Sequence, residues 1–182
     1  MNTTNQPTQI IELNLQRIAW QSFLGTALLS ILLLLLNAFL HNDFHFNLSL
    51  TNLILFMSGY ILLIVLHELS HLIGFVLFGK VPWSSLNYGV NLKLGVAYAT
   101  TNEPLQNKAM KRVLLLPFWT TGVLPTVLGF WMNHSLLVLL GAFLIGGAFG
   151  DFAMYKELRK VSNDAFIKDD PELPKLYVYE EK

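Results

Sequence analysis

The stretch TNLILFMSGYILLIVLHELSHLIGFVLFG, residues 51–79, is apolar except for a few positions, most of which form the motif HELSH at residues 67–71. A helix over this range would be about 43 Å long, whereas the hydrocarbon core of a bilayer is about 30 Å thick. The stretch therefore predicts a membrane-spanning helix that tilts or protrudes. Three ionisable residues within five positions of such a span are energetically costly, and residues of this kind usually mark function.

The motif places two histidines one helical turn apart. On a helix, His67 and His71 lie on the same face. Two neutral imidazoles at this spacing can bind one zinc ion, and Glu68 beside them can take a proton from an attacking water. This is the HExxH pattern of zinc metalloproteases. The alternative is a set of hydrogen bonds between helices with no metal.

Composition indicates the class of protein. The chain has 182 residues, of which 53% are hydrophobic and 13% are charged, about half the charged fraction of a soluble domain. We therefore expect an integral membrane protein with a single domain, residues 1–182. The net charge of zero gives no indication of a nucleic-acid partner. The absence of cysteine excludes thiolate ligands and leaves His, Asp and Glu to bind zinc.

Hydropathy predicts an all-α polytopic membrane protein with about four transmembrane helices. Their approximate bounds are 18–40, 51–79, 111–132 and 135–155. The third span contains Pro117, Gly122 and Pro125, so we expect a kinked helix. In the fourth span, Gly146 and Gly150 have the small-xxx-small spacing that lets another helix approach closely.

A small β element accompanies the helices. Apolar and polar residues alternate from 86 to 98, which predicts a strand, or a hairpin that turns near Asn91 to Lys93. One face of it is apolar and can lie on the membrane or on helix ends. A shorter alternation at 11–16 predicts a surface strand, with an interfacial helix as the alternative, and LYVY at 176–179 predicts one more strand.

The basic residues predict the orientation in the membrane. The loop at 41–50 and the turn at 133–134 have none, whereas the segment 80–112 has five and the tail 156–182 has six. The positive-inside rule then places both termini, the β element and the tail in the cytoplasm of a multi-pass cell-membrane protein.

This topology indicates a third metal ligand. The second and fourth spans both run from outside to inside, so HELSH and Asp151 lie toward the same leaflet. A catalytic zinc site has three protein ligands and an open fourth position. Asp151 is the only acidic residue in a later span, and the glycines beside it permit close contact between helices. The alternative is an interfacial Asp at a helix end.

Taken together, these features resemble the site-2 protease group of intramembrane metalloproteases: HELSH in a span, a polar strand-bearing segment, and an Asp on a later glycine-rich span. A nearer resemblance is to a family of bacterial membrane proteins described as putative zincin peptidases. It is carried by AYATTNEPL at 97–105, the proline of LLLP at 114–117, and GD at 150–151.

The resemblance to site-2 proteases implies that His67, His71 and Asp151 bind Zn²⁺ within the membrane and that Glu68 is the general base. The chain departs from that group in one respect. A glycine usually follows the ligand Asp there, whereas here Gly150 precedes Asp151. The Asn that assists the oxyanion in that group has no matching position here.

The predicted function is that of a zinc-dependent, membrane-embedded metallopeptidase with its site toward the cytoplasmic side. Its partners would be the lipid bilayer and a membrane-associated or extended peptide substrate. The strand at 86–98 could bind such a substrate edge-on, unless it serves as a self-paired hairpin packed on the membrane. The alternative function is a non-catalytic metal- or proton-handling membrane protein that uses the same His/Glu/Asp cluster. The intact HExxH motif argues against a structural protein with a degenerate site.

Overall fold

The structure is a computed structural model that describes residues 6–43, 49–92, 95–170 and 175–180. The chain divides into two compact units. Unit 1 comprises residues 1–15, 68–116 and 151–182, and unit 2 comprises residues 16–67 and 117–150. Within the described residues, four helices are long and apolar enough to cross a membrane: Leu15–His41, Leu50–Gly79, Asn107–Trp131 and Ser135–Leu158. These agree with the predicted spans to within a few residues.

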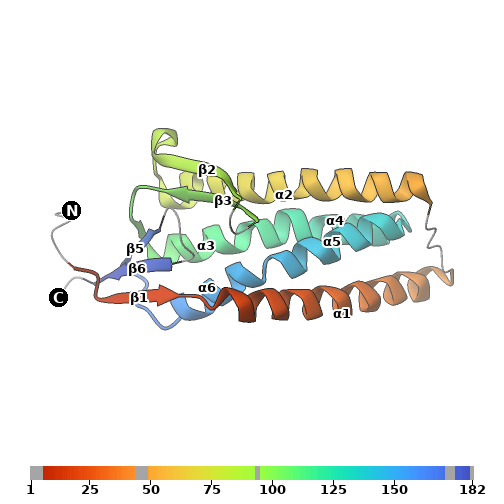
Figure 1. The fold of residues 1–182 in the computed structure, drawn as a ribbon, viewed down its shortest axis with the longest axis horizontal. Helices are drawn as coiled ribbons and strands as arrows, with labels where there is room; N and C mark the ends of the chain where they lie inside the picture. Colours follow the sequence, from red (N-terminus) through yellow and green to blue (C-terminus); the bar gives the residue numbers. More distant parts are fainter. Residues whose placement is uncertain (1–5, 44–48, 93–94, 171–174, 181–182) are drawn as a thin grey trace. The chain divides into compact units, whose positions relative to one another are not determined.

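Unit 2 is helical. It contains α1 (Leu15–His41), the first part of α2 (Leu50–Gly79), η2 (Phe118–Val123), α4 (Leu124–Trp131) and α5 (Ser135–Gly147). Helices α4 and α5 lie side by side (Figure 1). Two glycines allow this close approach, because a Cβ on Gly129 would lie 2.7 Å from the backbone nitrogen of Val138, and one on Gly141 would lie 2.8 Å from that of Thr126.

The glycine-rich part of the fourth span agrees with its prediction in part. The span has a one-residue irregularity at Ala148, since α5 ends at Gly147 and α6 (Phe149–Leu158) begins after Ala148. Gly146 packs directly on Thr26 of α1. A side chain at Gly147 or Gly150 would instead meet nothing within 4 Å in the described part of the chain. The predicted close approach of another helix is therefore confirmed at Gly146, whereas a Cβ at Gly150 would have open space around it.

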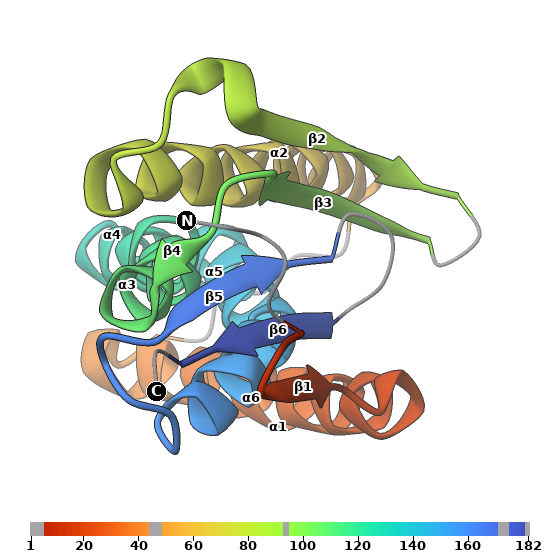
Figure 2. The same cartoon turned by 90° about the vertical axis from the view of Figure 1, so that its left-hand side faces the viewer.

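Unit 1 contains a four-stranded antiparallel sheet of order β1-β6-β5-β4 (Figure 2). The strands are β1 (Gln9–Glu12), β4 (Leu105–Gln106), β5 (Phe166–Asp169) and β6 (Lys175–Tyr179). The strand predicted at 176–179 is confirmed as β6. The prediction for 11–16 is right only in its first part, because β1 ends at Glu12 and α1 begins at Leu15. A six-residue alternation is too short to separate a strand from a following helix.

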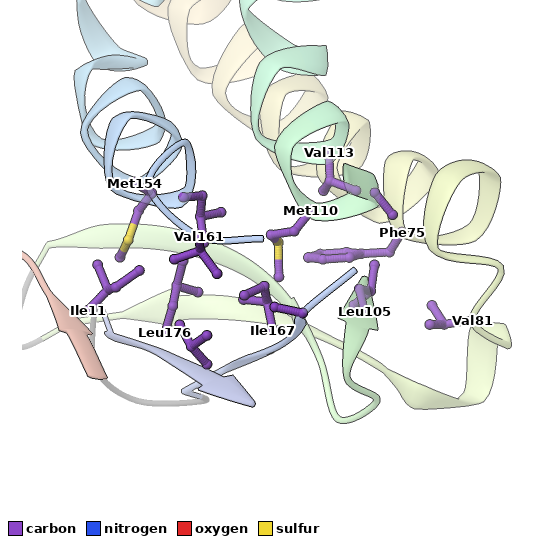
Figure 3. Packing of buried hydrophobic residues seen from close by; sticks show 14 residues of the cluster. Ile11, Phe75, Val81, Leu105, Met110, Val113, Met154, Val161, Ile167 and Leu176 are labelled. Atoms are coloured by element: carbon purple, nitrogen blue, oxygen red, sulfur yellow. The ribbon is translucent and has the colours of Figure 1, made fainter. Parts of the chain in front are cut away.

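One face of the sheet carries the hydrophobic core of unit 1. Ile167 of β5 packs with side chains of α3 (Asn107–Pro117), α6 and the last turns of α2 (Figure 3). Phe75, Met110, Val113 and Ile167 are all at most 2% exposed. Burial of such side chains contributes about 1.5–3 kcal/mol each. This core therefore fixes three helix segments, two of which carry predicted site residues.

The predicted hairpin is confirmed, also in unit 1. β2 (Leu86–Asn91) follows a short helix η1 (Trp83–Ser85) and pairs antiparallel with β3 (Val96–Thr101). The turn between the strands includes Gly95 at φ 67°. Residues 93–94 of this turn lie outside the described residues. Tyr88 and Val90 project from one face of β2 and are 73% and 62% exposed. The hairpin therefore presents an apolar face.

Candidate metal centre

His71 is buried on α2 and is held in one orientation. Its Nδ1 lies 3.2 Å from the carbonyl oxygen of Val113 on α3. A carbonyl only accepts, so Nδ1 carries the hydrogen and donates it. The other ring nitrogen, Nε2, lies 3.5 Å from Asp151 Oδ1. The imidazole is thus oriented with its metal-binding nitrogen toward the carboxylate.

A proline makes the Val113 carbonyl available. In an α-helix this oxygen would accept from the N–H four residues later, which is position 117. Pro117 has no N–H to donate. The carbonyl can therefore accept a hydrogen bond from His71. The same proline ends α3, and the π-helical segment η2 follows it.

His67 lies one turn before His71 on the same helix. The division between units 1 and 2 falls between His67 and Glu68, but α2 runs unbroken through it, so helical geometry fixes the two histidines relative to each other. Within unit 2, His67 Nδ1 lies 3.3 Å from the hydroxyl of Thr121. In both histidines, Nδ1 therefore contacts an oxygen atom of the protein.

Asp151 lies in the first turn of α6, where the helix dipole favours a negative charge. Its side chain is 18% exposed. A buried amide anchors the far end of this helix: Asn107 Nδ2 lies 2.9 Å from the carbonyl oxygens of Leu158, Val161 and Ser162. These carbonyls close the end of α6 and the turn after it. Asn107 thus helps to place Asp151.

The predicted ligand residues come together. His67, His71 and Asp151 each offer a ligand atom, and these atoms lie within 4.8 Å of one another. Tetrahedral zinc with ligands at about 2.0–2.1 Å separates ligand atoms by roughly 3.3–3.4 Å, close to the 3.5 Å between His71 and Asp151. Two imidazoles and one carboxylate form a known donor set for catalytic zinc, and it leaves a fourth position open.

The comparison with protein families also indicates zinc as the metal. A family model described as "Putative zincin peptidase" matches residues 60–166, more than half of the chain. The chain belongs to this family. The matched range contains Glu68 and all three residues of the metal-binding group. No curated protein and no solved structure matches the chain.

In this zincin family member, Glu68 follows His67 directly on α2 and is half-buried. Its carboxylate lies close enough to His71 to interact with it electrostatically. The metal-binding group does not include Glu68. Glu68 therefore lies near the metal-binding group without belonging to it.

A further carboxyl interacts with His71. Asp169, at the end of β5, shares the core-facing side of the strand with Ile167. Burial raises the pKa of Asp169 to about 7, although the Thr100 hydroxyl and His71 favour the charged form. Sequence reasoning missed this residue, because DDPELP at 169–174 predicts a turn-rich linker. In fact Asp169 belongs to a strand, while residues 171–174 lie outside the described part.

Proposed function

We propose that this chain is a zinc-dependent, membrane-embedded metallopeptidase whose site opens toward the cytoplasmic side. The observation that carries the proposal is the group formed by His67, His71 and Asp151 on long apolar helices. Membership of the zincin peptidase family supports hydrolysis of peptide bonds as the reaction. The distribution of basic residues supports a cell-membrane location with both termini in the cytoplasm.

In this mechanism His67, His71 and Asp151 would hold Zn²⁺. The bound metal would supply polarisation of the scissile carbonyl and a lower pKa for the attacking water. Glu68 takes the proton of the attacking water and delivers it to the leaving amine. The carbonyl of Val113 keeps His71 oriented during these steps, because it binds the ring nitrogen that faces away from Asp151.

The substrate would be an extended peptide, since a peptide bond inside a helix hides its carbonyl. The β2–β3 hairpin is a two-stranded sheet, so backbone groups along its outer edges can pair with an added strand. Its apolar face favours contact with the bilayer, which would bring a membrane-associated peptide to it. The partners in this proposal are therefore lipid and an extended, membrane-associated peptide.

Glu68→Gln tests the proposal, because it retains the shape of the side chain and removes its basicity. We expect cleavage of a quenched fluorescent peptide library by protein in liposomes to fall by about 10²- to 10⁴-fold. Zinc content, measured by metal analysis, should stay at the wild-type value. Glu157→Gln on the same protein is the matched control, since Glu157 pairs with Lys160.

Undiminished cleavage by Glu68→Gln would refute Glu68 as the base. A wild-type protein that cleaves no peptide but carries zinc or protons into liposomes, and loses that flux in Glu68→Gln, would favour the ion-handling alternative.

A further inference from the structure

The helix that follows Pro117 is not α-helical over its next six residues. From Phe118 to Val123 it is a π-helix, and the N–H of Leu124 reaches the carbonyl of Trp119, five residues back. Pro117 cannot donate an N–H, and the helix widens beyond it. Short π-helical segments occur frequently at functional sites, where the extra residue changes which side chains share a face.

Thr121, in the middle of this π-helix, is 2% exposed and contacts two groups. Its hydroxyl donates to the carbonyl oxygen of Pro117 at 2.9 Å. The same oxygen lies 3.3 Å from His67 Nδ1. A hydroxyl has one hydrogen, and a carbonyl can only accept it. The oxygen of Thr121 must therefore accept from His67, and the hydrogen of the neutral imidazole is on Nδ1.

This arrangement leaves the lone pair of His67 on Nε2. His71 likewise carries a hydrogen on Nδ1, because this nitrogen donates to the carbonyl of Val113. The run from Val113 to Thr121 thus supplies one oxygen to each histidine. Metal-binding histidines commonly donate their second ring N–H to such an oxygen, which fixes the tautomer and the ring orientation.

We propose that Thr121 is a positioning residue that keeps His67 in the Nδ1–H tautomer and so directs its Nε2 to the metal. The inference rests on the proposed function for the presence of a metal. The tautomer, however, is a property of the metal-free protein and can be measured without it. Loss of an outer partner of this kind lowers metal affinity by about 10- to 100-fold.

Three substitutions test the role of the hydroxyl. Thr121→Val has nearly the same shape and removes the oxygen. Thr121→Ser retains the oxygen and should rescue the protein. Thr126→Val is the matched control, because the hydroxyl of Thr126 is also buried in this helix and donates to the carbonyl of Gly122 at 2.8 Å. It therefore loses an equivalent hydrogen bond that does not involve His67.

Two measurements on the full-length protein in detergent decide the outcome. The first is the ¹⁵N spectrum of histidine-labelled, metal-free protein, in which the signals of His67 are identified by their loss in His67→Ala. We expect one Nδ1–H tautomer in the wild type and a mixture in Thr121→Val. The second is the zinc dissociation constant from chelator competition, which should rise by about 10- to 100-fold in Thr121→Val.

Thr121→Ser and Thr126→Val should match the wild type in both measurements. A wild-type tautomer and wild-type affinity in Thr121→Val would overturn the inference, and so would an equal loss in Thr126→Val. A wild-type protein that binds no zinc would refute the proposed function instead. The tautomer comparison in metal-free protein would then still decide the role of Thr121.

Discussion

His71 Nε2 and Asp151 Oδ1 lie 3.5 Å apart, although they come from two different helices. Two contacts within unit 1 hold these side chains in place. Val113 binds the opposite nitrogen of the imidazole, and Asn107 anchors the helix of the carboxylate. The two side chains are thus placed to offer two ligand atoms to one metal ion.

Asp151→Asn should lower zinc affinity by more than about 100-fold, because it removes a ligand charge, whereas loss of an outer partner alone costs about 10- to 100-fold. Isothermal titration or chelator competition measures the change. Glu103→Gln and Glu157→Gln are controls, since neither residue belongs to the metal-binding group. Wild-type affinity in Asp151→Asn, with a loss in Glu157→Gln, would show that the ligand assignment is wrong.

Substitution of Asn107 should destabilise unit 1. Its amide has two hydrogens for three carbonyl oxygens, each at 2.9 Å. Asn107→Ala removes this donor, and the carbonyls of Leu158 and Ser162 keep only the longer 3.3 Å bonds from backbone N–H groups, so we expect a cost of roughly 1–3 kcal/mol. Asn107→Asp should cost more, because it places a carboxylate against them. Thermal unfolding in detergent measures both, and the exposed Asn163→Ala should stay within about 0.5 kcal/mol of the wild type. Equal stability of Asn107→Asp and the wild type would contradict this account.

The pH dependence of stability should reveal Asp169. The pKa of its carboxyl is about 7 in the folded protein and has its usual lower value in the unfolded chain. Between about pH 4 and 7 the folded state therefore holds a proton that the unfolded state has released, and stability falls as pH rises through this window. Above pH 7 the carboxyl is ionised in both states, and the free-energy cost of burying its charge is present in full.

The measurement is thermal unfolding of the metal-free protein at pH 5 and pH 8. Asp169→Asn removes the titrating group, so this variant should lose less stability between the two values than the wild type does. The exposed Asp164→Asn serves as the control and should follow the wild type. The same loss in Asp169→Asn as in the wild type would show that another group dominates this pH range.

Cysteine labelling tests the orientation. Single cysteines at Leu50 and Met132, both exposed, should react with a membrane-impermeant thiol reagent added to intact cells. Cysteines at the exposed positions Lys108 and Ser162 should react only after the cells are opened. The expectation follows from the basic residues, which concentrate in 80–112 and after 156. The reverse pattern would place the site toward the outside.

Much of the fold was predictable because its signals are local. Four apolar stretches predicted the long helices, and strict alternation predicted β2 and β3 with their return near Asn91. The HExxH spacing indicated a pair of histidines on one helix face. Asp151 could be selected because it is the only acidic residue in the later spans as predicted, 111–132 and 135–155, and the structure places it beside His71.

The residues that sequence reasoning missed act through contacts distant in the chain. Asp169 was missed because its neighbours are turn formers, and its burial depends on the packing of the sheet against the helices. Thr121 has no sequence signal of its own, since its role arises from the π-helix around it. Pro117 predicted an interruption, but not that the oxygen it leaves available would bind His71.

Pro117→Ala should separate helix stability from metal binding. The new N–H can donate to the carbonyl of Val113 and compete with His71 Nδ1–H for it. Alanine favours the helix by about 3 kcal/mol over proline, partly offset here because Pro117 is buried and its removal leaves a cavity. We therefore expect thermal stability that is unchanged or higher, a mixed tautomer of His71 in ¹⁵N spectra, and zinc affinity that is about 10- to 100-fold weaker.

Pro125→Ala is the matched control for this last prediction. It also replaces a proline in the same helix, but its new N–H would face a carbonyl four or five residues back, which is not the oxygen that His71 contacts. It should leave the tautomer of His71 unchanged. Both variants could instead lose zinc affinity equally while His71 keeps its Nδ1–H in each. The prolines would then act only through the direction of the helix axis, and the carbonyl of Val113 would not control the tautomer of His71.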